Sequence, residues 1–300
     1  MSYAEHFGLD REPFSNAPDA RFYFDSEQHS QALIRLRYAV DSNKGLAVLV
    51  GGVGTGKTTL ARRMLDNLSE DRYESSLLVM VHSGITPEWI LTRIAMQLGI
   101  EEPAADRLAL LRQLYERLQQ IEAAGRRAVV LIDEAQMLQT RELMEEFRGL
   151  LNLEIPGKKL LNIVFFGLPE VEDCLRLDEP LAQRVAVKYH LHSLTVDTTE
   201  SYIKHRLLVA GARRMFFSPD AIPLIHRYAG GVPRLINTVC DNCLFETFLR
   251  KMEEVTPKIV HSVAGDLGLL RQPLAGAAPQ ENFGEFDEIE SLLDRLEQKM

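Results

Sequence analysis

The stretch VLVGGVGTGKTTLARRML, residues 48–65, decides how the rest of the chain is interpreted. It begins with apolar residues typical of a buried strand and continues through four glycines to Lys57, Thr58 and a helix-forming sequence. Gly51 and Gly56 occupy the glycine positions of the pattern G-x-x-x-x-G-K-[ST], which binds nucleotide phosphates. The stretch therefore predicts a phosphate-binding loop between a strand and a helix.

The chemistry of such a loop requires this spacing. Glycines let backbone N–H groups turn inward around the β-phosphate, and the helix N-terminus adds its positive end. We expect Lys57 to reach the β and γ oxygens and to act in catalysis, and the Thr58 hydroxyl to bind Mg²⁺. The alternative is a glycine turn without a ligand. The predicted nucleotide-binding residues of the loop are Gly51, Gly52, Val53, Gly54, Thr55, Gly56, Lys57, Thr58 and Thr59.

An acidic pair about 75 residues beyond the loop supplies the second half of the predicted site. The sequence VVLIDEAQ, residues 129–136, is an apolar strand that ends in Asp133 and Glu134. We expect Asp133 to hold Mg²⁺ and to contribute to nucleotide binding, and Glu134 to act as the general base for the attacking water. The alternative is a solvated acidic start of a helix. With the loop, the pair predicts an enzyme that hydrolyses ATP with Mg²⁺.

Apolar runs that alternate with helical patterns predict the fold class. The predicted strands are 46–50, 77–81, 128–132, 160–167 and 185–191. Because helices separate these runs, we expect an α/β fold of the P-loop NTPase type, with a parallel sheet and helices on both faces. Helical patterns at 197–210, 219–229 and 233–250 follow without strands. The predicted domains are therefore a P-loop domain at 1–193 and a small all-α lid at 194–268.

The last thirty residues have a different composition. Residues 269–283 are rich in Pro, Ala and Gly and are predicted to be a linker. An acidic tail helix is expected at 284–300, where apolar residues repeat at steps of three and four: Phe286, Ile289, Leu293, Leu296 and Met300. This helix is either a frayed amphipathic tail or an element for docking a partner or for self-association.

Composition excludes several classes of protein. No apolar run is long enough to span a membrane, and the charged N-terminus does not resemble a signal peptide. Three cysteines do not indicate a disulfide framework, and Cys240 and Cys243 are expected to be buried thiols on a lid helix. The net charge of −9 argues against a strongly basic nucleic-acid surface, although local patches remain compatible with it. These features predict a cytoplasmic protein.

Several separate stretches resemble one known family. They are residues 6–60, VVLIDEAQML at 129–138, residues 147–170, LAQRVAVKYHLHSLT at 181–195 and GGVPRLINTVCDNCL at 230–244. Together they resemble the N-terminal ATPase module of the general secretion pathway protein A family, the ExeA type of AAA+ ATPase, over about residues 1–268. The resemblance implies an AAA+ fold with a helical lid and hydrolysis of ATP within a homo-oligomer.

The resemblance also implies roles for two arginines. Arg184 matches the arginine-finger position, a catalytic residue that completes the site of a neighbouring subunit, and Arg234 matches the sensor 2 position that contacts nucleotide from the lid. Both roles agree with chemistry, because phosphoryl transfer needs positive charge beyond Lys57. The alternative for each arginine is a surface salt bridge.

The sequence departs from the family pattern in two ways. The family often has Gln at the end of the fourth strand, where this chain has Leu168, and Asn162 is expected at the far end of that strand. Slow turnover is therefore expected. Secretion members also typically continue into a membrane span and a peptidoglycan-binding domain, which this sequence does not predict.

The resulting prediction is an ATPase that drives or switches a protein partner in the assembly of a cell-envelope or secretion system. It would be cytoplasmic, or peripheral at the inner membrane through that partner. One alternative is a DNA-associated ATPase resembling transposition regulators. Another is an ATP-gated scaffold that hydrolyses slowly, in agreement with Leu168.

Overall fold

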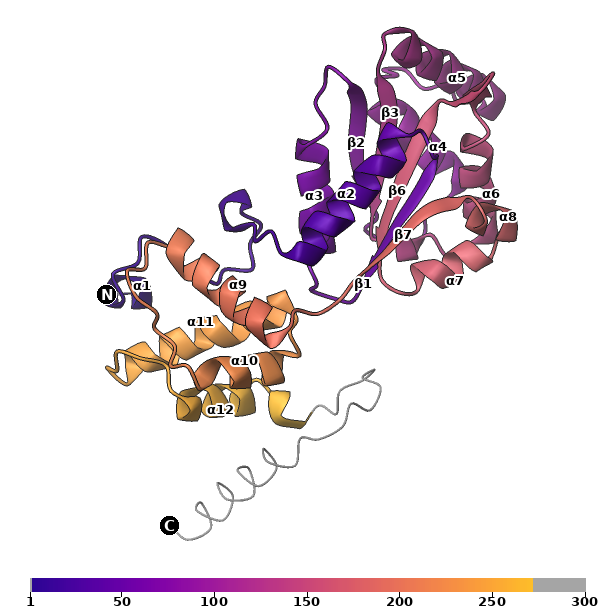
Figure 1. Ribbon diagram of the computed structural model, residues 1–300. Helices are drawn as coiled ribbons and strands as arrows, with labels where there is room; N and C mark the ends of the chain where they lie inside the picture. The colour runs from indigo at the N-terminus through magenta and orange to yellow at the C-terminus, as the bar shows by residue number, and fades with distance from the viewer. Residues whose placement is uncertain (1, 272–300) are drawn as a thin grey trace.

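The computed structural model describes residues 2–271, and its central element is a five-stranded parallel sheet with the strand order β2-β3-β6-β1-β7 (Figure 1). Its strands are β1 (Leu46–Gly51), β2 (Tyr73–Val79), β3 (Arg127–Asp133), β6 (Leu161–Gly167) and β7 (Val185–Leu191). A separate antiparallel hairpin consists of β4 (Glu154–Ile155) and β5 (Lys158–Lys159). Residues 272–300, which carry most of the predicted linker and the predicted tail helix, lie outside the described residues.

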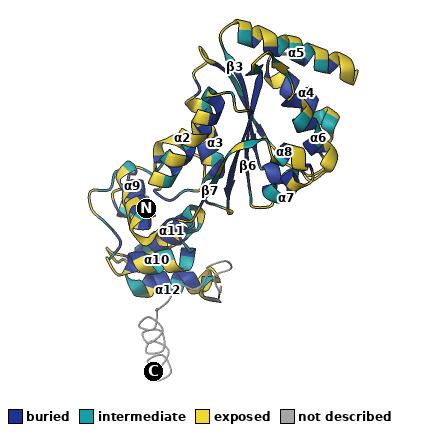
Figure 2. Cartoon of the chain, turned by 45° about the vertical axis from the view of Figure 1, so that its right-hand side comes forward, coloured by how far each residue is buried: buried dark blue, intermediate teal, exposed yellow. Residues whose placement is uncertain are grey.

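Helices cover both faces of the sheet, as the apolar strand sequences require. The helices of this half are α2 (Glu27–Asp41), α3 (Lys57–Asp66), α4 (Pro87–Gln97), α5 (Arg107–Ala123), η2 (Ala135–Met137), α6 (Arg141–Leu150), α7 (Val171–Arg176) and α8 (Glu179–Ala182). Neighbouring residues of one strand enter different cores: Leu49 packs with α2 and α3, whereas Val48 and Val50 pack with α4 to α8. The central strands β1, β3 and β6 are thus buried on both sides, whereas the edge strand β7 alternates between half-buried and exposed residues (Figure 2).

The second half of the described chain is helical. It contains α9 (Val196–Val209), α10 (Ala221–Ala229), α11 (Pro233–Leu249), α12 (Pro257–Asp266) and η3 (Leu269–Arg271). Cys240 and Cys243 lie in its core, where burial raises the pKa of Cys243 to about 12. Within the described residues, no helix is long and apolar enough to cross a membrane.

The first residues of the chain pack on the helical half. Alpha-helix α1 (Tyr3–His6) and η1 (Ala20–Phe22) place Phe7, Phe14 and Phe22 in the same apolar core as α9 to α12. The sequence pattern assigned this segment to the domain at 1–193, yet its apolar side chains are buried against the lid helices. A division of the chain near residue 193 therefore stays a proposal, and the segment before α2 belongs with the helices by its packing.

The predicted fold class is confirmed, and the differences concern individual elements. Strand β2 begins at Tyr73 rather than residue 77, because the polar sequence YESS also pairs with β3. In α2 the exposed Ile34 and Tyr38 obscure the apolar stripe, whereas α6 buries a regular apolar face of Leu143, Met144, Phe147 and Leu150.

Candidate nucleotide-binding site

The glycine loop lies between the end of β1 and the start of α3. Gly54 and Gly56 have positive φ angles of 76° and 103°, which glycine adopts without steric cost. Both positions also have no room for a side chain: a Cβ on Gly54 would lie 2.8 Å from Cβ of Arg234, and one on Gly56 would lie 3.0 Å from Nε2 of His29. The loop is therefore enclosed by the lid on one side and by α2 on the other.

Lys57 is the buried cation of the loop. Its side chain is 6% exposed, and its Nζ donates a hydrogen bond to the carbonyl oxygen of Gly52 at 2.9 Å. Burial lowers the pKa of Lys57, and the charges of Glu134 and Asp133 oppose that shift. A poorly hydrated ammonium group that is bonded to a loop carbonyl and lies in the field of two acids is well placed to exchange that carbonyl for a phosphate oxygen.

Asp133 is the last residue of β3, and one of its carboxylate oxygens has no hydrogen-bond partner among the described residues. The residue is fully buried, and its Oδ1 accepts a hydrogen bond from the Glu134 N–H at 3.0 Å, whereas Oδ2 has no partner. Burial raises the pKa of Asp133, and the neighbouring Thr58 hydroxyl and Glu134 N–H partly offset that rise. Because buried polar atoms nearly always have partners, an open carboxylate oxygen beside a hydroxyl is suited to a cation.

Glu134 follows Asp133 with a φ of 56°, an uncommon conformation for a residue other than glycine. Strand β6 separates β3 from β1, and because the strands are parallel, the ends that carry the acids and the loop lie at one edge of the sheet. The structure thus brings Glu134 near Lys57, and its negative charge partly opposes the lowering of the Lys57 pKa by burial. Lys57, Thr58, Asp133 and Glu134 form one constellation, as the sequence predicts.

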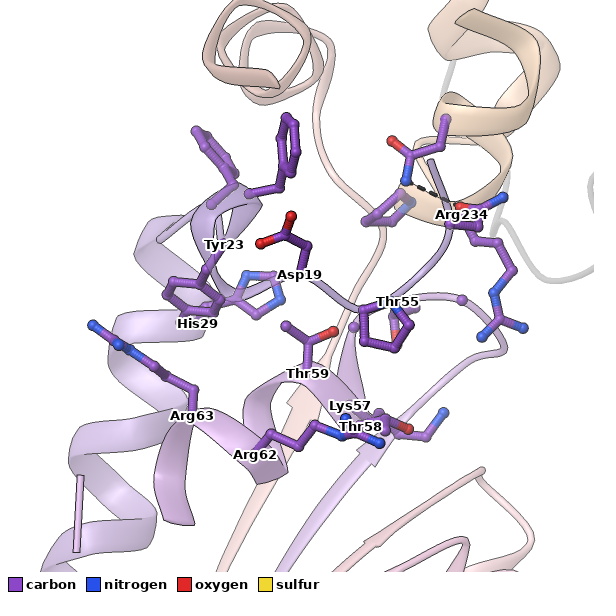
Figure 3. Close-up of a pocket in the computed structure, with 18 of the residues that line it drawn as sticks. Asp19, Tyr23, His29, Thr55, Lys57, Thr58, Thr59, Arg62, Arg63 and Arg234 are labelled. Atoms are coloured by element: carbon purple, nitrogen blue, oxygen red, sulfur yellow. Dashed lines mark hydrogen bonds between the residues drawn. The ribbon is translucent and has the colours of Figure 1, made fainter. Parts of the chain in front are cut away.

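A cavity of about 760 Å³ opens beside this constellation (Figure 3). Its walls come from the glycine loop, α3, the segment before α2 and the lid helices. The labelled side chains in the close-up include Lys57, Thr58 and Thr59 from the loop and Arg234 from the lid. The volume is within the range of cavities that hold nucleotide-sized ligands.

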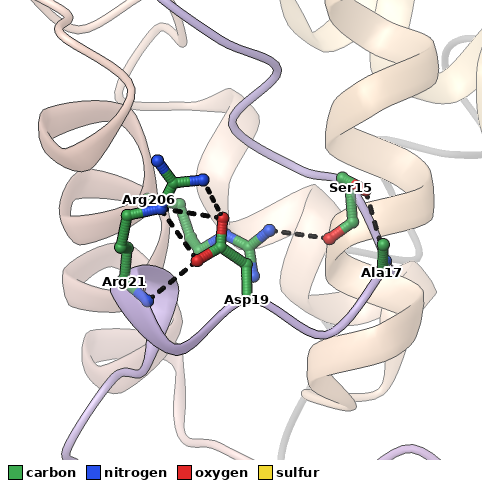
Figure 4. Close-up of polar contacts among 5 residues, drawn as sticks. All are labelled: Ser15, Ala17, Asp19, Arg21 and Arg206. Carbon is green, nitrogen blue, oxygen red and sulfur yellow. Dashed lines mark hydrogen bonds and ion pairs between the residues drawn. The ribbon is translucent and has the colours of Figure 1, made fainter.

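The buried Arg206 of α9 connects the segment before α2 to the lid by hydrogen bonds (Figure 4). Its Nε donates to the Pro13 carbonyl at 2.6 Å, its Nη2 donates to the Ser15 carbonyl at 2.8 Å, and its guanidinium lies 4.4 Å from the centre of the Phe22 ring. Sequence patterns missed this wall of the cavity, because contacts between residues about 190 positions apart leave no local periodicity.

A second contact that the sequence did not indicate supports the loop from α2. The Nδ1 of His29 lies 2.6 Å from the Oγ of Ser26, and its Nε2 faces Gly56. A hydrogen bond between the ring and the Thr55 backbone partly opposes the effect of burial on the pKa of His29. Burial lowers the pKa of His29, so the neutral ring is favoured at this position. His29 therefore holds the glycine loop in place from behind.

The two predicted arginines lie in different places. Arg234 stands in the first turn of α11, its N–H donates to the Gly54 carbonyl at 3.3 Å, and its charge contributes to lowering the pKa of Lys57. Arg234 also lines the cavity, whereas Arg184 does not.

Arg184 precedes β7, an edge strand of the sheet, at the end opposite the glycine loop. Its Nη1 donates to Oδ1 of Asn152 at 2.6 Å and to the carbonyl oxygen of Arg148 at 3.3 Å. The six residues of β1 between these two ends span roughly 20 Å at 3.3 Å per residue. Arg184 therefore lies too far away to contact a nucleotide in its own loop.

Leu168 and Asn162 lie at opposite ends of β6, as the sequence predicts. Leu168 follows the strand at the edge of the cavity and offers it no polar side chain. Asn162 lies at the opposite end, where its Oδ1 accepts from the Gly45 N–H at 3.3 Å and its Nδ2 donates to Oδ1 of Asn43 at 3.1 Å. Asn162 thus cannot take the place of a polar group at Leu168.

Comparisons with known proteins agree with this architecture. Residues 40–175 match the model of the family described as "AAA domain". General secretion pathway protein A of Aeromonas hydrophila is 38% identical over 278 residues, which are 91% of this chain and 49% of that protein. The chain therefore spans about half the length of this curated relative.

Two solved structures show the same fold at low sequence identity. The ORC2 protein of Aeropyrum pernix has a TM-score of 0.63 at 18% identity, covering 86% of this chain and 72% of that one. The RuvB Holliday junction branch migration motor of Thermotoga maritima has a TM-score of 0.55 at 17% identity, covering 81% and 70%. The matched domain and the relative lead to one conclusion: the chain contains an AAA domain at residues 40–175 and is a homologue of general secretion pathway protein A over 91% of its length.

Proposed function

We propose that the chain binds ATP with Mg²⁺ and hydrolyses it to ADP and phosphate. The observation that carries this proposal is the open Oδ2 of the fully buried Asp133, which lies at the same sheet edge as Lys57 and the glycine loop. A buried carboxylate oxygen without a partner raises the free energy of the nucleotide-free protein. A ligand that binds Oδ2 would supply the missing interaction and remove this unfavourable free energy.

Thr58 and Asp133 would hold the Mg²⁺ ion, directly or through water. Their hydroxyl and carboxylate oxygens are hard ligands of the kind that Mg²⁺ takes in nucleotide sites, and the open Oδ2 fits that requirement. Once bound, the ion would neutralise charge on the β- and γ-phosphates. Lys57 would transfer its hydrogen bond from the Gly52 carbonyl to a phosphate oxygen.

Glu134 would take the proton from the attacking water as general base. Charge that develops on the γ-phosphate would be stabilised by Lys57, by Arg234 from the lid, and by Arg184 of a neighbouring subunit. The trans role of Arg184 is supported by its location at the far end of an edge strand, outside its own cavity. Hydrolysis would then require an oligomer.

The proposed output is movement or switching of a protein partner in the assembly of a cell-envelope or secretion system. The homology to general secretion pathway protein A supports this pathway, and the net charge of −9 gives no support to a duplex DNA partner. The protein would act in the cytoplasm, or at the inner membrane through its partner.

The test is steady-state ATP hydrolysis by wild type and by Glu134→Gln. We expect wild-type turnover per subunit to rise with protein concentration, and Glu134→Gln to bind ATP normally without turnover, because Lys57 and the magnesium ligands remain. Glu142→Gln, an exposed acid of α6, is the matched control and should behave as wild type.

Three results would change the proposal. Undiminished hydrolysis by Glu134→Gln would remove Glu134 as base. Stimulation by duplex DNA with a steep salt dependence would favour a DNA-associated ATPase. Tight ATP binding without turnover in wild type would favour an ATP-gated scaffold.

A further inference from the structure

The side chain of Gln136 is buried beside the proposed base and serves no role described above. Gln136 lies in the short helix η2, directly after Asp133 and Glu134, and is only 5% exposed. A buried amide destabilises a protein unless its oxygen and its nitrogen find partners. The partners of Gln136 therefore indicate what this position does.

Both ends of the amide are bonded to parts of the site. Nε2 donates to Oε2 of Glu134 at 2.5 Å, and Oε1 accepts from the backbone N–H of Leu168 at 3.0 Å. A hydrogen bond to a carboxylate is stronger than one between neutral groups. Gln136 thus connects the carboxylate of Glu134 to the residue that follows β6.

The surroundings leave this bridge little freedom. A Cβ on Gly167 would lie 3.2 Å from Oε1 of Gln136, so the glycine at the end of β6 makes room for the amide. On the other side, Glu134 has a φ of 56°, a conformation that persists only where neighbouring contacts hold it. The amide is therefore part of a fixed arrangement around the carboxylate.

We propose that Gln136 is a positioning residue that fixes the carboxylate of Glu134 for the attacking water and sets its place relative to the end of β6. One carboxylate oxygen is held by the amide, and the other is left to accept the proton. The Leu168 side chain offers no polar group, so the link between β6 and the base runs through the Leu168 N–H and the Gln136 amide. The inference rests on the proposed role of Glu134 as base.

Two substitutions separate the two contacts. Gln136→Met keeps the length of the side chain and loses both hydrogen bonds, whereas Gln136→Glu keeps an acceptor for the Leu168 N–H and places a second carboxylate against Glu134. We expect both variants to lower kcat on the order of 10²-fold, because a displacement of about 1 Å in a catalytic group has such an effect. ATP affinity should stay near that of wild type, since neither variant touches the glycine loop.

Gln139→Met is the matched control, because Gln139 is an exposed glutamine three residues further along the same segment. It should hydrolyse at the wild-type rate, which excludes a general effect of methionine in this loop. ATP affinity and melting temperature of each variant identify any that has lost its fold, and the nearly isosteric Gln136→Glu is the second variant for that case.

The experiment is hydrolysis of ATP at saturation by wild type, Glu134→Gln and the three glutamine variants, with ATP affinity measured separately. Lowered kcat with unchanged affinity in both Gln136 variants is the expected result. If wild type hydrolyses and Glu134→Gln does not, but either Gln136 variant reaches the wild-type kcat, the positioning role is overturned while the proposed function stands. If Glu134→Gln also hydrolyses at the wild-type rate, the proposed base itself has failed.

Discussion

The two ends of the parallel sheet differ in whether their buried polar side chains have complete hydrogen bonding. Asn162, at the start of β6, is 2% exposed and has its oxygen and nitrogen bonded to Gly45 and Asn43. Asp133, at the end of neighbouring β3, is fully buried and leaves Oδ2 without a partner among the described residues. The first polar residue completes the fold, whereas the second leaves an interaction for a ligand to make.

The same contrast applies to the cations at the two ends. Lys57 at the carboxyl end is bonded to a carbonyl of its own loop and has a lowered pKa from burial. Arg184 at the amino end is half-buried and held by Asn152 and the Arg148 carbonyl. We infer that one end binds a nucleotide, whereas the other end holds an arginine in a fixed position far from the loop of its own chain.

The largest expected effect is that of Lys57→Ala. Nucleotide binding should be lost, because the phosphate charges lose the fixed cation of the loop. Lys44→Ala, at the amino end of β1, is the control and should bind ATP as wild type does. Calorimetric titration with ATP and Mg²⁺ measures both. An affinity of Lys57→Ala within a few fold of wild type would contradict the assignment of the loop.

A smaller effect, on stability, distinguishes Asp133 from Asn162. Asn162→Ala should lower the free energy of unfolding by about 1–3 kcal/mol, since it leaves the buried Gly45 N–H unpaired, and should leave ATP affinity unchanged. Asp133→Asn should weaken the Mg²⁺-dependent binding of ATP and should raise the free energy of unfolding of the nucleotide-free protein.

The sign of the Asp133 effect follows from its pKa. Burial raises that pKa in the folded protein, so the folded state retains the proton to higher pH than the unfolded chain does. Stability is therefore lost as pH rises above the unfolded pKa of about 4, and the ionised carboxylate destabilises the protein at neutral pH. Asp133→Asn removes this dependence. Denaturant unfolding without nucleotide, compared at pH 7.5 and near the unfolded pKa, measures this dependence in both proteins. A less stable Asp133→Asn at pH 7.5 would show that the carboxylate supports the fold.

The smallest expected effect belongs to neither end of the sheet. Removal of residues 272–300 should leave melting temperature and ATP affinity unchanged, because described residues form the three apolar cores and the predicted linker separates the tail from them. Loss of a partner or of oligomer stability is the expected change, measured by sedimentation. A large fall in melting temperature without nucleotide would show instead that this segment packs on the core.

The grouping of the candidate nucleotide-binding residues was predictable because they lie in two short stretches of the chain. Gly51 to Thr59 form one loop, and the Asp133–Glu134 pair ends one strand, so local sequence carries the chemistry. The parallel sheet with helices on both faces also follows from the alternation of apolar strands and helices, whereas the strand order does not.

The rest of the site depends on tertiary contacts that no sequence period records. Arg206 donates hydrogen bonds to the carbonyls of Pro13 and Ser15, about 190 residues earlier in the chain. Because of these contacts and the shared apolar core, the first residues pack on the lid and not on the P-loop half. Gln136 meets Leu168 only because β6 inserts between β1 and β3. Such pairs become visible only when the chain has folded.

The central claim is that Arg184 completes the site of a neighbouring subunit, and mixed oligomers test it most directly. Arg184→Ala alone should bind ATP with nearly wild-type affinity, while its turnover falls on the order of 10³–10⁵-fold, as for related arginine fingers. Glu134→Gln alone should be inactive because it lacks the base, yet it still offers Arg184 to its neighbour.

When the two inactive proteins are mixed, each Arg184→Ala subunit beside a Glu134→Gln subunit regains a complete site. The measurement is ATP hydrolysis as a function of mixing ratio, with subunit exchange followed by fluorescence transfer between labelled chains. The account predicts that activity reappears and is greatest in mixtures of both proteins. Exchange without any activity, or wild-type turnover by Arg184→Ala alone, would contradict it.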